Sequence, residues 1–129
     1  MRKIKFRAWD KEDKKMYIVY RIDFYDVPSD SITLMLSKEI PVGTEMVHEE
    51  RSLKKTKLMQ YTGLKDKNGK EIYEKDLVKQ GGWIGEVVWS NGWGGWVTGT
   101  GHFDDSGVAE HCRQFEVVGN IYENKELLK

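Results

Sequence analysis

Length, composition and charge set the first limits on this protein. Hydrophobic residues make up 39% of its 129 residues and aromatic residues 12%, which argues against a disordered chain. Lysine and arginine together number 21, as do aspartate and glutamate, so the net charge is zero and the whole molecule exerts no general attraction on phosphate backbones. A chain of this length forms one domain with its own core.

Cysteine usage and hydropathy indicate the compartment. Cys112 is the single cysteine, which excludes an internal disulfide and a four-thiolate metal site and is typical of a reducing cytoplasm. No apolar run approaches the roughly 18–20 residues of a membrane span. The N-terminus alternates instead of entering an apolar block, so we expect no signal peptide. The expectation is a soluble cytoplasmic protein without a membrane partner.

The first residues alternate between apolar and basic side chains. Ile4, Phe6 and Ala8 fall on one side of an extended chain, as in a half-buried strand. A polar turn at residues 10–14 and a second alternating run follow, which predicts an antiparallel hairpin. The apolar positions of the second run are Met16, Ile18, Tyr20, Ile22 and Phe24.

A third short strand is predicted at residues 32–36, after a break at residues 28–30. From residue 37 to residue 55 the chain is polar, charged and weakly periodic. We expect a long connection there with at most one helical turn. It is also the best place for an internal boundary.

The second half begins near Leu58 and is rich in turn signals. Asn68-Gly69 and Asn91-Gly92 predict type I′ turns, which need positive φ at two positions. The C-terminal residues 123–129 predict a short helix. Strands are predicted at residues 57–61, 77–79, 84–89, 93–98 and 114–122.

This pattern predicts a mainly β fold. Several short strands at close spacing, without a long amphipathic helix, favour a partly closed SH3-like β-barrel at about residues 56–129. A small antiparallel sheet at about residues 1–55 would pack on or beside it. The two parts together form one domain with few short helices.

Three segments of the sequence are distinctive: MRKIKFRAWD at residues 1–10, LMQYTGLKDKNGKEIYE at residues 58–74 and VGNIYEN at residues 118–124. Together they resemble the YopX family, small proteins encoded by bacteriophages and by prophages of low-GC Gram-positive bacteria. The resemblance implies a mainly β fold and a phage or prophage origin. It implies no catalytic residues, because the family has no established activity.

Two positions depart from the family pattern. Lys75 precedes Asp76 where glycine is common, and Lys125 follows Asn124 where proline is common. Because residues other than glycine avoid positive φ, Lys75 argues against a tight positive-φ turn at that position.

The segment from Gly81 to Gly107 holds four of the five tryptophans and nine of the thirteen glycines, and no Lys or Arg occurs from Gln80 to Cys112. Aromatic side chains on a glycine-bent hairpin would form a binding surface for a base, a sugar or a partner loop. Alternatively, the tryptophans fill the barrel core and the glycines shape a turn around Trp93. The candidate residues are Trp83, Trp89, Trp93 and Trp96, of which Trp89 and Trp96 would be the core residues in the alternative.

Basic residues form a second candidate. Lys3, Lys5 and Arg7 share one face of the first predicted strand, where they would contact successive phosphates without reading bases. The alternative is a solvated strand face whose lysines discourage edge-to-edge aggregation. The remaining basic residues fall in two groups, Arg2, Lys11, Lys14 and Lys15 near the N-terminus and Arg51, Lys54, Lys55 and Lys57 further on.

Metal, cofactor and catalytic sites are not predicted. The ligand-type residues near the end of the chain match no standard metal-site spacing, and adjacent His111 and Cys112 would point to opposite faces of a strand. The carboxylates around the middle segment are typical of solvated turns. The metal candidates are His102, Asp104, Asp105, His111 and Cys112, and the carboxylates are Asp66, Glu71, Glu74, Asp76 and Glu86.

The leading hypothesis is a non-enzymatic phage accessory protein that binds a macromolecule. A protein partner or self-association ranks above nucleic acid, because the aromatic-rich segment is acidic and the net charge is zero. Two alternatives stay open: a nucleic-acid-binding protein that uses the basic N-terminal strand, and an enzyme acting on a small ligand at the tryptophans.

Overall fold

The computed structural model describes residues 3–24, 32–37, 48–99 and 106–128. Within these ranges the protein is almost entirely β, with only short helical turns, so the predicted fold class is confirmed in its main feature. Internal contacts divide the chain into two compact units. The first unit is Ile4–Gln60, and the second contains Tyr61–Lys129.

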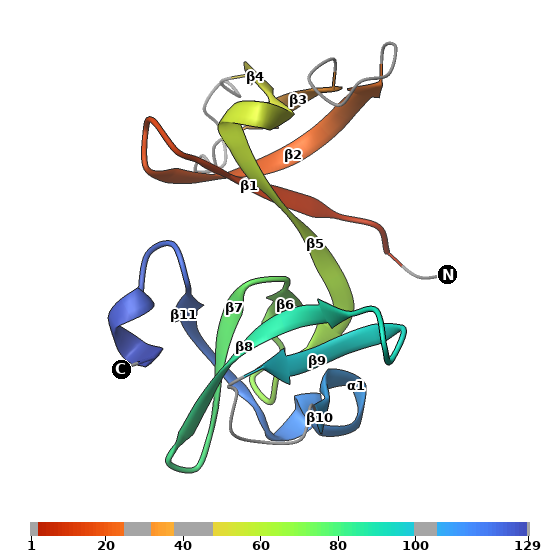
Figure 1. Cartoon of the computed structure of the whole chain (residues 1–129), viewed down its shortest axis with the longest axis vertical. Coiled ribbons are helices and arrows are strands. Elements are labelled where there is room, and N and C mark those ends of the chain that lie inside the picture. Colours follow the sequence, from red (N-terminus) through yellow and green to blue (C-terminus); the bar gives the residue numbers. More distant parts are fainter. Residues whose placement is uncertain (1–2, 25–31, 38–47, 100–105, 129) are drawn as a thin grey trace. The chain divides into compact units, whose positions relative to one another are not determined.

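The first unit is an antiparallel sheet in the order β4-β3-β2-β1-β5 (Figure 1). In β1, Ala8 lies opposite Tyr17 of β2 and Leu58 of β5, so the three side chains share one face. Ala8, Tyr17 and Leu34 are buried together there and form the core of this unit. The elements are β1 (Phe6–Asp10), β2 (Lys15–Phe24), β3 (Ile32–Ser37), β4 (His48–Ser52), the 3-10 helix η2 (Leu53–Lys55) and β5 (Thr56–Lys65).

The predicted β1–β2 hairpin is confirmed, but β2 buries the opposite face from the one that its alternation predicted. Tyr17 and Val19 face the core, whereas Ile18 and Tyr20 are 41% and 44% exposed. A bulge after Val19 shifts the register, and Ile22 then packs on the core. The prediction was wrong because both faces of this run carry large apolar side chains, so period two alone cannot select the buried one.

A strand, β4, lies in the stretch predicted to be an irregular connection. Its sequence, HEERS, is polar, and among the described strands it pairs with β3 alone, at the edge of the sheet. Charged edge strands lack the apolar alternation that reveals half-buried ones, which is why the prediction missed it. The expectation was at most one helical turn, and the described part of this stretch holds one, η2, where the Ser52 hydroxyl accepts a hydrogen bond from the Lys54 amide at 3.1 Å.

The second unit contains a sheet in the order β10-β9-β8-β7-β11, together with a hairpin of β5 and β6. β5 runs through both units: residues 56–60 pair with β1, and Tyr61 and Lys65 pair with β6. Figure 1 traces this continuous strand. The elements are β6 (Glu71–Tyr73), β7 (Asp76–Gln80), β8 (Trp83–Ser90), β9 (Gly95–Gly99), β10 (Ser106–Gly107), α1 (Val108–His111), η3 (Cys112–Gln114), β11 (Glu116–Asn120) and η4 (Lys125–Leu128).

Most elements of the second unit contribute side chains to its core. Ile72 of β6, Val78 of β7 and Val87 of β8 are fully buried, and Val108 and Phe115 join them from the helical segment that precedes β11. That segment was not predicted to be helical, because one or two turns are too short to show a period. The predicted C-terminal helix is present as η4, a 3-10 helix.

Both Asn-Gly pairs lie in hairpin connections, as predicted, but neither forms a type I′ turn. Asn68 and Asn91 do not have positive φ, and the left-handed residues are Gly69 at +80° and Gly94 at +66°. In the first turn the Asp66 carboxylate accepts hydrogen bonds from the amides of Asn68 and Lys70. In the second turn the Ser90 hydroxyl accepts a hydrogen bond from the Trp93 amide. These side-chain acceptors stabilise longer connections than a two-residue turn.

Lys75, between β6 and β7, has φ of +71°, so the positive-φ turn that lysine argued against is present. Its amide donates to the Val87 carbonyl at 2.8 Å, and its carbonyl accepts the Ile121 amide at 3.1 Å. The neighbouring Asp76 carboxylate accepts the Tyr73 amide at 2.8 Å. Contacts with two other segments and a hydrogen bond within the turn therefore hold a conformation that costs lysine about 1–2 kcal/mol.

The two ends of the second sheet, β10 and β11, do not pair with each other in the part of the chain that the structure describes. Closure into an SH3-like barrel therefore stays a prediction. Among the described residues, no helix has the length and apolar character needed to cross a membrane.

Candidate functional site

The β8–β9 hairpin presents three of the tryptophans. Trp89 lies directly opposite Trp96, and Ser90 lies opposite Gly95 at the base of the connection. The Ser90 carbonyl accepts the Gly94 amide at 2.8 Å, and the Ser90 hydroxyl accepts the Trp93 amide at 3.2 Å. Gly94 supplies the positive φ that returns the chain to β9. The backbone that holds Trp93 at the tip is therefore fixed by local hydrogen bonds.

Two of the indole rings on this hairpin are exposed, and the third contacts one of them. Trp89 and Trp96 meet edge to face, with ring centroids 5.1 Å apart and an interplanar angle of 78°. The Trp89 indole nitrogen donates to the Asn91 side-chain oxygen at 3.0 Å. Trp89 is 48% exposed and Trp93 is 60% exposed. We call Trp89, Trp93 and Trp96 the tryptophan surface.

Trp83 and Trp96 contribute to the core. Trp83 is half-buried and packs on the core of the second unit, with its ring centroid 6.2 Å from that of Phe115. Trp96 is half-buried and also packs on that core. The four candidate tryptophans therefore do not form one surface. The alternative in which both Trp89 and Trp96 fill the core fails for Trp89, which keeps nearly half of its surface exposed.

The charge near the hairpin is low. Glu86 is the acidic residue of β8, and the Lys75 ammonium lies 3.3 Å from its carboxylate. Lysine and arginine are missing from the sequence between Gln80 and Cys112. The segment that carries the tryptophan surface, from Gln80 to Cys112, therefore contributes no lysine or arginine to it.

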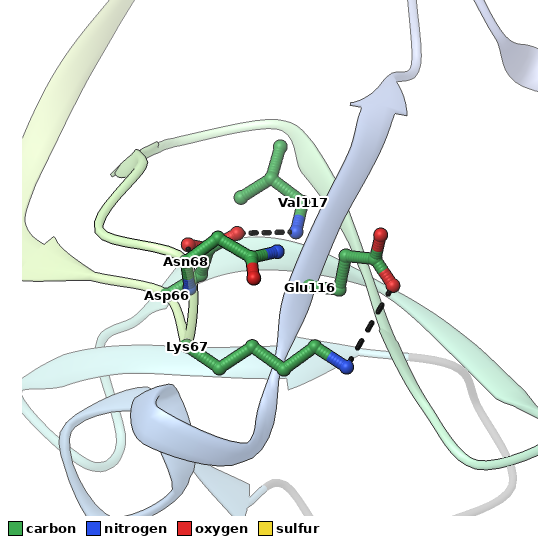
Figure 2. A network of polar contacts seen from close by, with 5 residues as sticks. All are labelled: Asp66, Lys67, Asn68, Glu116 and Val117. Atoms are coloured by element: carbon green, nitrogen blue, oxygen red, sulfur yellow. Dashed lines mark hydrogen bonds and ion pairs between the residues drawn. The ribbon is translucent and has the colours of Figure 1, made fainter.

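The middle segment, by contrast, has a structural role centred on Asp66 (Figure 2). One Asp66 oxygen accepts the amides of Asn68 and Lys70 at 2.8 and 2.9 Å, and the other accepts the Val117 amide of β11 at 2.9 Å. The Lys67 amide donates to the Phe115 carbonyl at 3.0 Å. Asp66 and Asp76 are buried, so the expectation that these carboxylates are solvated was wrong for both.

Hydrogen bonding controls the protonation of Asp66. Burial by itself raises the pKa of this carboxyl, but the amides of Val117, Lys70 and Asn68 and the charge of Lys70 together hold the pKa below its ordinary value of 3.8. The carboxylate is therefore ionised at neutral pH, where it acts as an acceptor for backbone amides and not as a general acid.

The predicted phosphate contacts are arranged differently from the expectation. β1 begins at Phe6, so Lys3 and Lys5 precede the strand and only Arg7 lies in it. Both lysines are exposed, whereas Arg7 is half-buried. Lys3 also groups with the second unit, and Lys5 and Arg7 with the first. The sequence alternation extends to Lys3, whereas the strand begins only at Phe6.

The proposed metal ligands are only partly described. His102, Asp104 and Asp105 lie outside the described residues. His111 ends α1 with its ring centroid 6.3 Å from that of Phe115, and Cys112 begins η3 and is buried. The two residues therefore lie in a helical segment, where the argument from the opposite faces of a strand does not apply. Among the described residues, no group of three or more His, Cys, Asp or Glu side chains is placed to hold a metal ion.

The fold and site define a small, mainly β protein of two units with an exposed aromatic hairpin. Residues 5–129 match the family described as YopX protein, which is nearly the whole chain. The chain belongs to the YopX family. The crystal structure of protein EF1440 from Enterococcus faecalis is similar, with a TM-score of 0.64, 26% sequence identity and coverage of 100% of both chains. A search of curated proteins found no match.

Proposed function

We propose that the protein is a non-enzymatic binding module and that the tryptophan surface contacts a protein partner. The observation behind this proposal is that Trp89 and Trp93 are 48% and 60% exposed on a hairpin whose turn is fixed by hydrogen bonds. Burying an indole removes a large apolar area from water, and tryptophan is enriched among the residues that dominate protein interfaces. A rigid display lowers the entropy lost on binding.

The charge of the segment favours a protein over nucleic acid at this surface. From Gln80 to Cys112 the sequence has four acidic residues and no Lys or Arg. Such a segment repels a phosphate backbone, whereas a Lys or Arg side chain of a partner protein stacks favourably on an indole face.

Membership of the YopX family supports a proposal about where the protein acts. We place the protein among the accessory proteins of phages and prophages, acting in the cytoplasm of the bacterial host, on the basis of its match to the YopX family. Closure of the second unit into an SH3-like barrel would give the hairpin a rigid scaffold. A second copy of the chain is the simplest protein partner to test.

The first measurement is acrylamide quenching of tryptophan fluorescence. We expect a readily quenched fraction that falls when Trp89 and Trp93 are both replaced by phenylalanine. The matched control is Trp83→Phe, which removes a half-buried indole packed on the core and leaves the quenched component in place. Uniform protection of the wild-type emission would contradict the proposal.

Binding is tested with a Trp89→Ala/Trp93→Ala variant. Immobilised wild type should retain a specific protein from a lysate of the host bacterium, or should self-associate in sedimentation velocity, and the variant should lose that interaction. Tyr20→Ala removes a comparably exposed aromatic ring from the first unit and should leave the interaction unchanged. Equal binding by the double variant and the wild type, with both folded by circular dichroism, would overturn the proposal.

A further inference from the structure

Two basic segments that are far apart in the sequence meet in the first unit. β1 and β5 pair with Asp10 opposite Thr56, which places the β1–β2 turn beside η2. The Lys11 amide donates to the Lys55 carbonyl at 3.4 Å, and the Lys11 ammonium donates to the Lys54 carbonyl at 3.5 Å, across 43 residues of sequence. The structure therefore joins charges that the sequence shows as separate groups.

The resulting lysine cluster has six members, all exposed. Among the described residues, none of the six ammonium groups makes an ion pair with a carboxylate. The members are Lys11 and Lys14 of the β1–β2 connection, Lys15 at the start of β2, Lys54 and Lys55 of η2, and Lys57 of β5.

Carboxylates in the same turn compensate only part of this charge. Asp10 is 1% exposed and its side chain accepts the amides of Glu12 and Asp13 at 2.8 and 3.1 Å. Asp13 also accepts the hydroxyl of Tyr17. Only Glu12 and Asp13 are exposed carboxylates of this turn. Among the described side chains of the β1–β2 connection, η2 and the first residues of β2 and β5, six exposed ammonium groups therefore face two exposed carboxylates, which gives a local positive field on a chain of zero net charge.

We infer that the lysine cluster binds the phosphate backbone of single-stranded nucleic acid. Neutralising phosphates releases condensed counterions, and the free energy of that release is available to any uncompensated cluster of this kind. The contact is independent of sequence, because ammonium groups on phosphates position a strand but do not read its bases.

An aromatic ring beside the cluster favours a single strand. Trp9 lies directly opposite Lys57 on β5, so the two side chains share one face of the sheet, and Trp9 is half-buried. Sites for single strands combine cations along the backbone with aromatic rings on which bases stack. A membrane surface fits less well, because stable anchoring to a membrane takes a second contribution besides basic charge, such as inserted apolar side chains. All six residues of the cluster are lysines, and the nearest exposed apolar side chain in sequence is that of Ile18.

This site is independent of the tryptophan surface. All six lysines belong to the first unit, and the tryptophans of that surface belong to the second. A result that disproves one of the two proposals therefore does not disprove the other.

The test uses fluorescence anisotropy of labelled oligo(dT) with the full-length protein over a range of salt concentrations. We expect affinity to fall linearly with salt on a double-logarithmic plot, with a slope of about 0.7 for each phosphate neutralised. In the variant Lys11→Gln/Lys54→Gln/Lys55→Gln the slope should fall by about 2, and low-salt affinity should drop at least about tenfold.

The matched control is Lys65→Gln/Lys79→Gln/Lys125→Gln, which removes the same charge from exposed positions of the second unit. It should keep the wild-type slope. Equal loss in both variants, an unchanged slope in the cluster variant, or no wild-type binding at low salt would overturn the inference. So would binding to phosphatidylserine vesicles without binding to oligo(dT), which would assign the cluster to a membrane surface. Circular dichroism confirms that each variant is folded.

Discussion

The Asp66 side chain connects two segments of the second unit. A single carboxylate accepts three backbone amides, two from the turn that follows it and one from Val117, 51 residues further along the chain. Hydrogen bonds to a charged acceptor are stronger than neutral ones. Asp66 thus ties the β5–β6 connection to β11.

Replacing Asp66 with asparagine should destabilise the protein by about 1–3 kcal/mol. The amide keeps the size of the carboxylate, but it offers one acceptor oxygen and turns a donor group toward a backbone amide. Urea unfolding at neutral pH measures the effect. Glu126→Gln, an exposed carboxylate in η4, is the matched control and should change stability by less than about 0.5 kcal/mol. An equal effect of both substitutions would contradict the assigned role.

The same residue predicts a pH dependence. Because the pKa of Asp66 is lowered in the folded state, its ionised form stabilises the protein fully above the unfolded pKa, near 3.8, and that contribution disappears as pH falls through the lower folded value. The difference in free energy of unfolding between wild type and Asp66→Asn should be constant at neutral pH and should shrink below about pH 4. A difference that grows on acidification would refute this assignment.

Residue types were recognised from the sequence more readily than their environments. Asp66 and Asp76 stand in turn-rich segments where aspartate is usually solvated, yet both are buried, because each accepts amides that would otherwise lack a partner. Lys75 has a conformation that its side chain disfavours, because its backbone hydrogen bonds are made with β8 and with the turn after β11, both distant in the sequence. Local sequence does not contain those partners.

At the level of elements, the end of β11 shows close packing of a turn on its own strand. A Cβ atom at Gly119 would overlap the side chain of Asn124. That oxygen accepts the Asn120 amide at 3.2 Å, and the Asn120 side chain in turn accepts the amides of Tyr122 and Glu123, both at 3.0 Å. The distinctive VGNIYEN segment is therefore explained by the turn it builds.

Gly119→Ala should accordingly destabilise the protein by about 1–3 kcal/mol, mainly through overpacking against Asn124 and partly through its positive φ. In an Asn124→Gly background the clashing side chain is absent, so the same substitution should cost clearly less. Thermal unfolding of the four members of this double-mutant cycle measures the coupling. Additive effects would show that the contact between these two positions is not the cause.

The two Asn-Gly hairpins also show that the sequence predicts where a feature lies better than it predicts its detailed structure. Their positions followed from the Asn-Gly pairs, but their turn types did not, because Asp66 and Ser90 supply acceptors that stabilise longer connections. The exposure of the tryptophan surface was likewise open, since a glycine-rich hairpin is compatible with buried or exposed indoles. Cross-strand register decided it, by placing Trp89 opposite Trp96 near the tip.

At the level of the whole molecule, β5 is the element common to both units. Each unit has its own buried cluster, with Leu34 in the first and Ile72 in the second, both 0% exposed. Because β5 passes from one sheet to the other without a linker, we expect the units to unfold together.

Leu34→Ala and Ile72→Ala should each destabilise the whole protein by about 2–5 kcal/mol. Urea unfolding followed by far-ultraviolet circular dichroism and by tryptophan fluorescence should give coincident transitions, because four of the five tryptophans report on the second unit. The matched control is Ile18→Ala at an exposed position, with an effect below about 1 kcal/mol. A second transition in Leu34→Ala alone would show that the units unfold independently.

The sequence by itself determined the mainly β class, the family, the hairpin positions and most strands, because period two, Asn-Gly pairs and distinctive segments are local signals. The tertiary structure decided the buried face of β2, the presence of β4, the burial of Asp66 and the separation of Trp83 from the other hairpin tryptophans. It also brought Lys11 beside Lys54 and Lys55. Each of these depends on which strands pair and in what register, and pairing between distant segments is set by the packing of the whole chain.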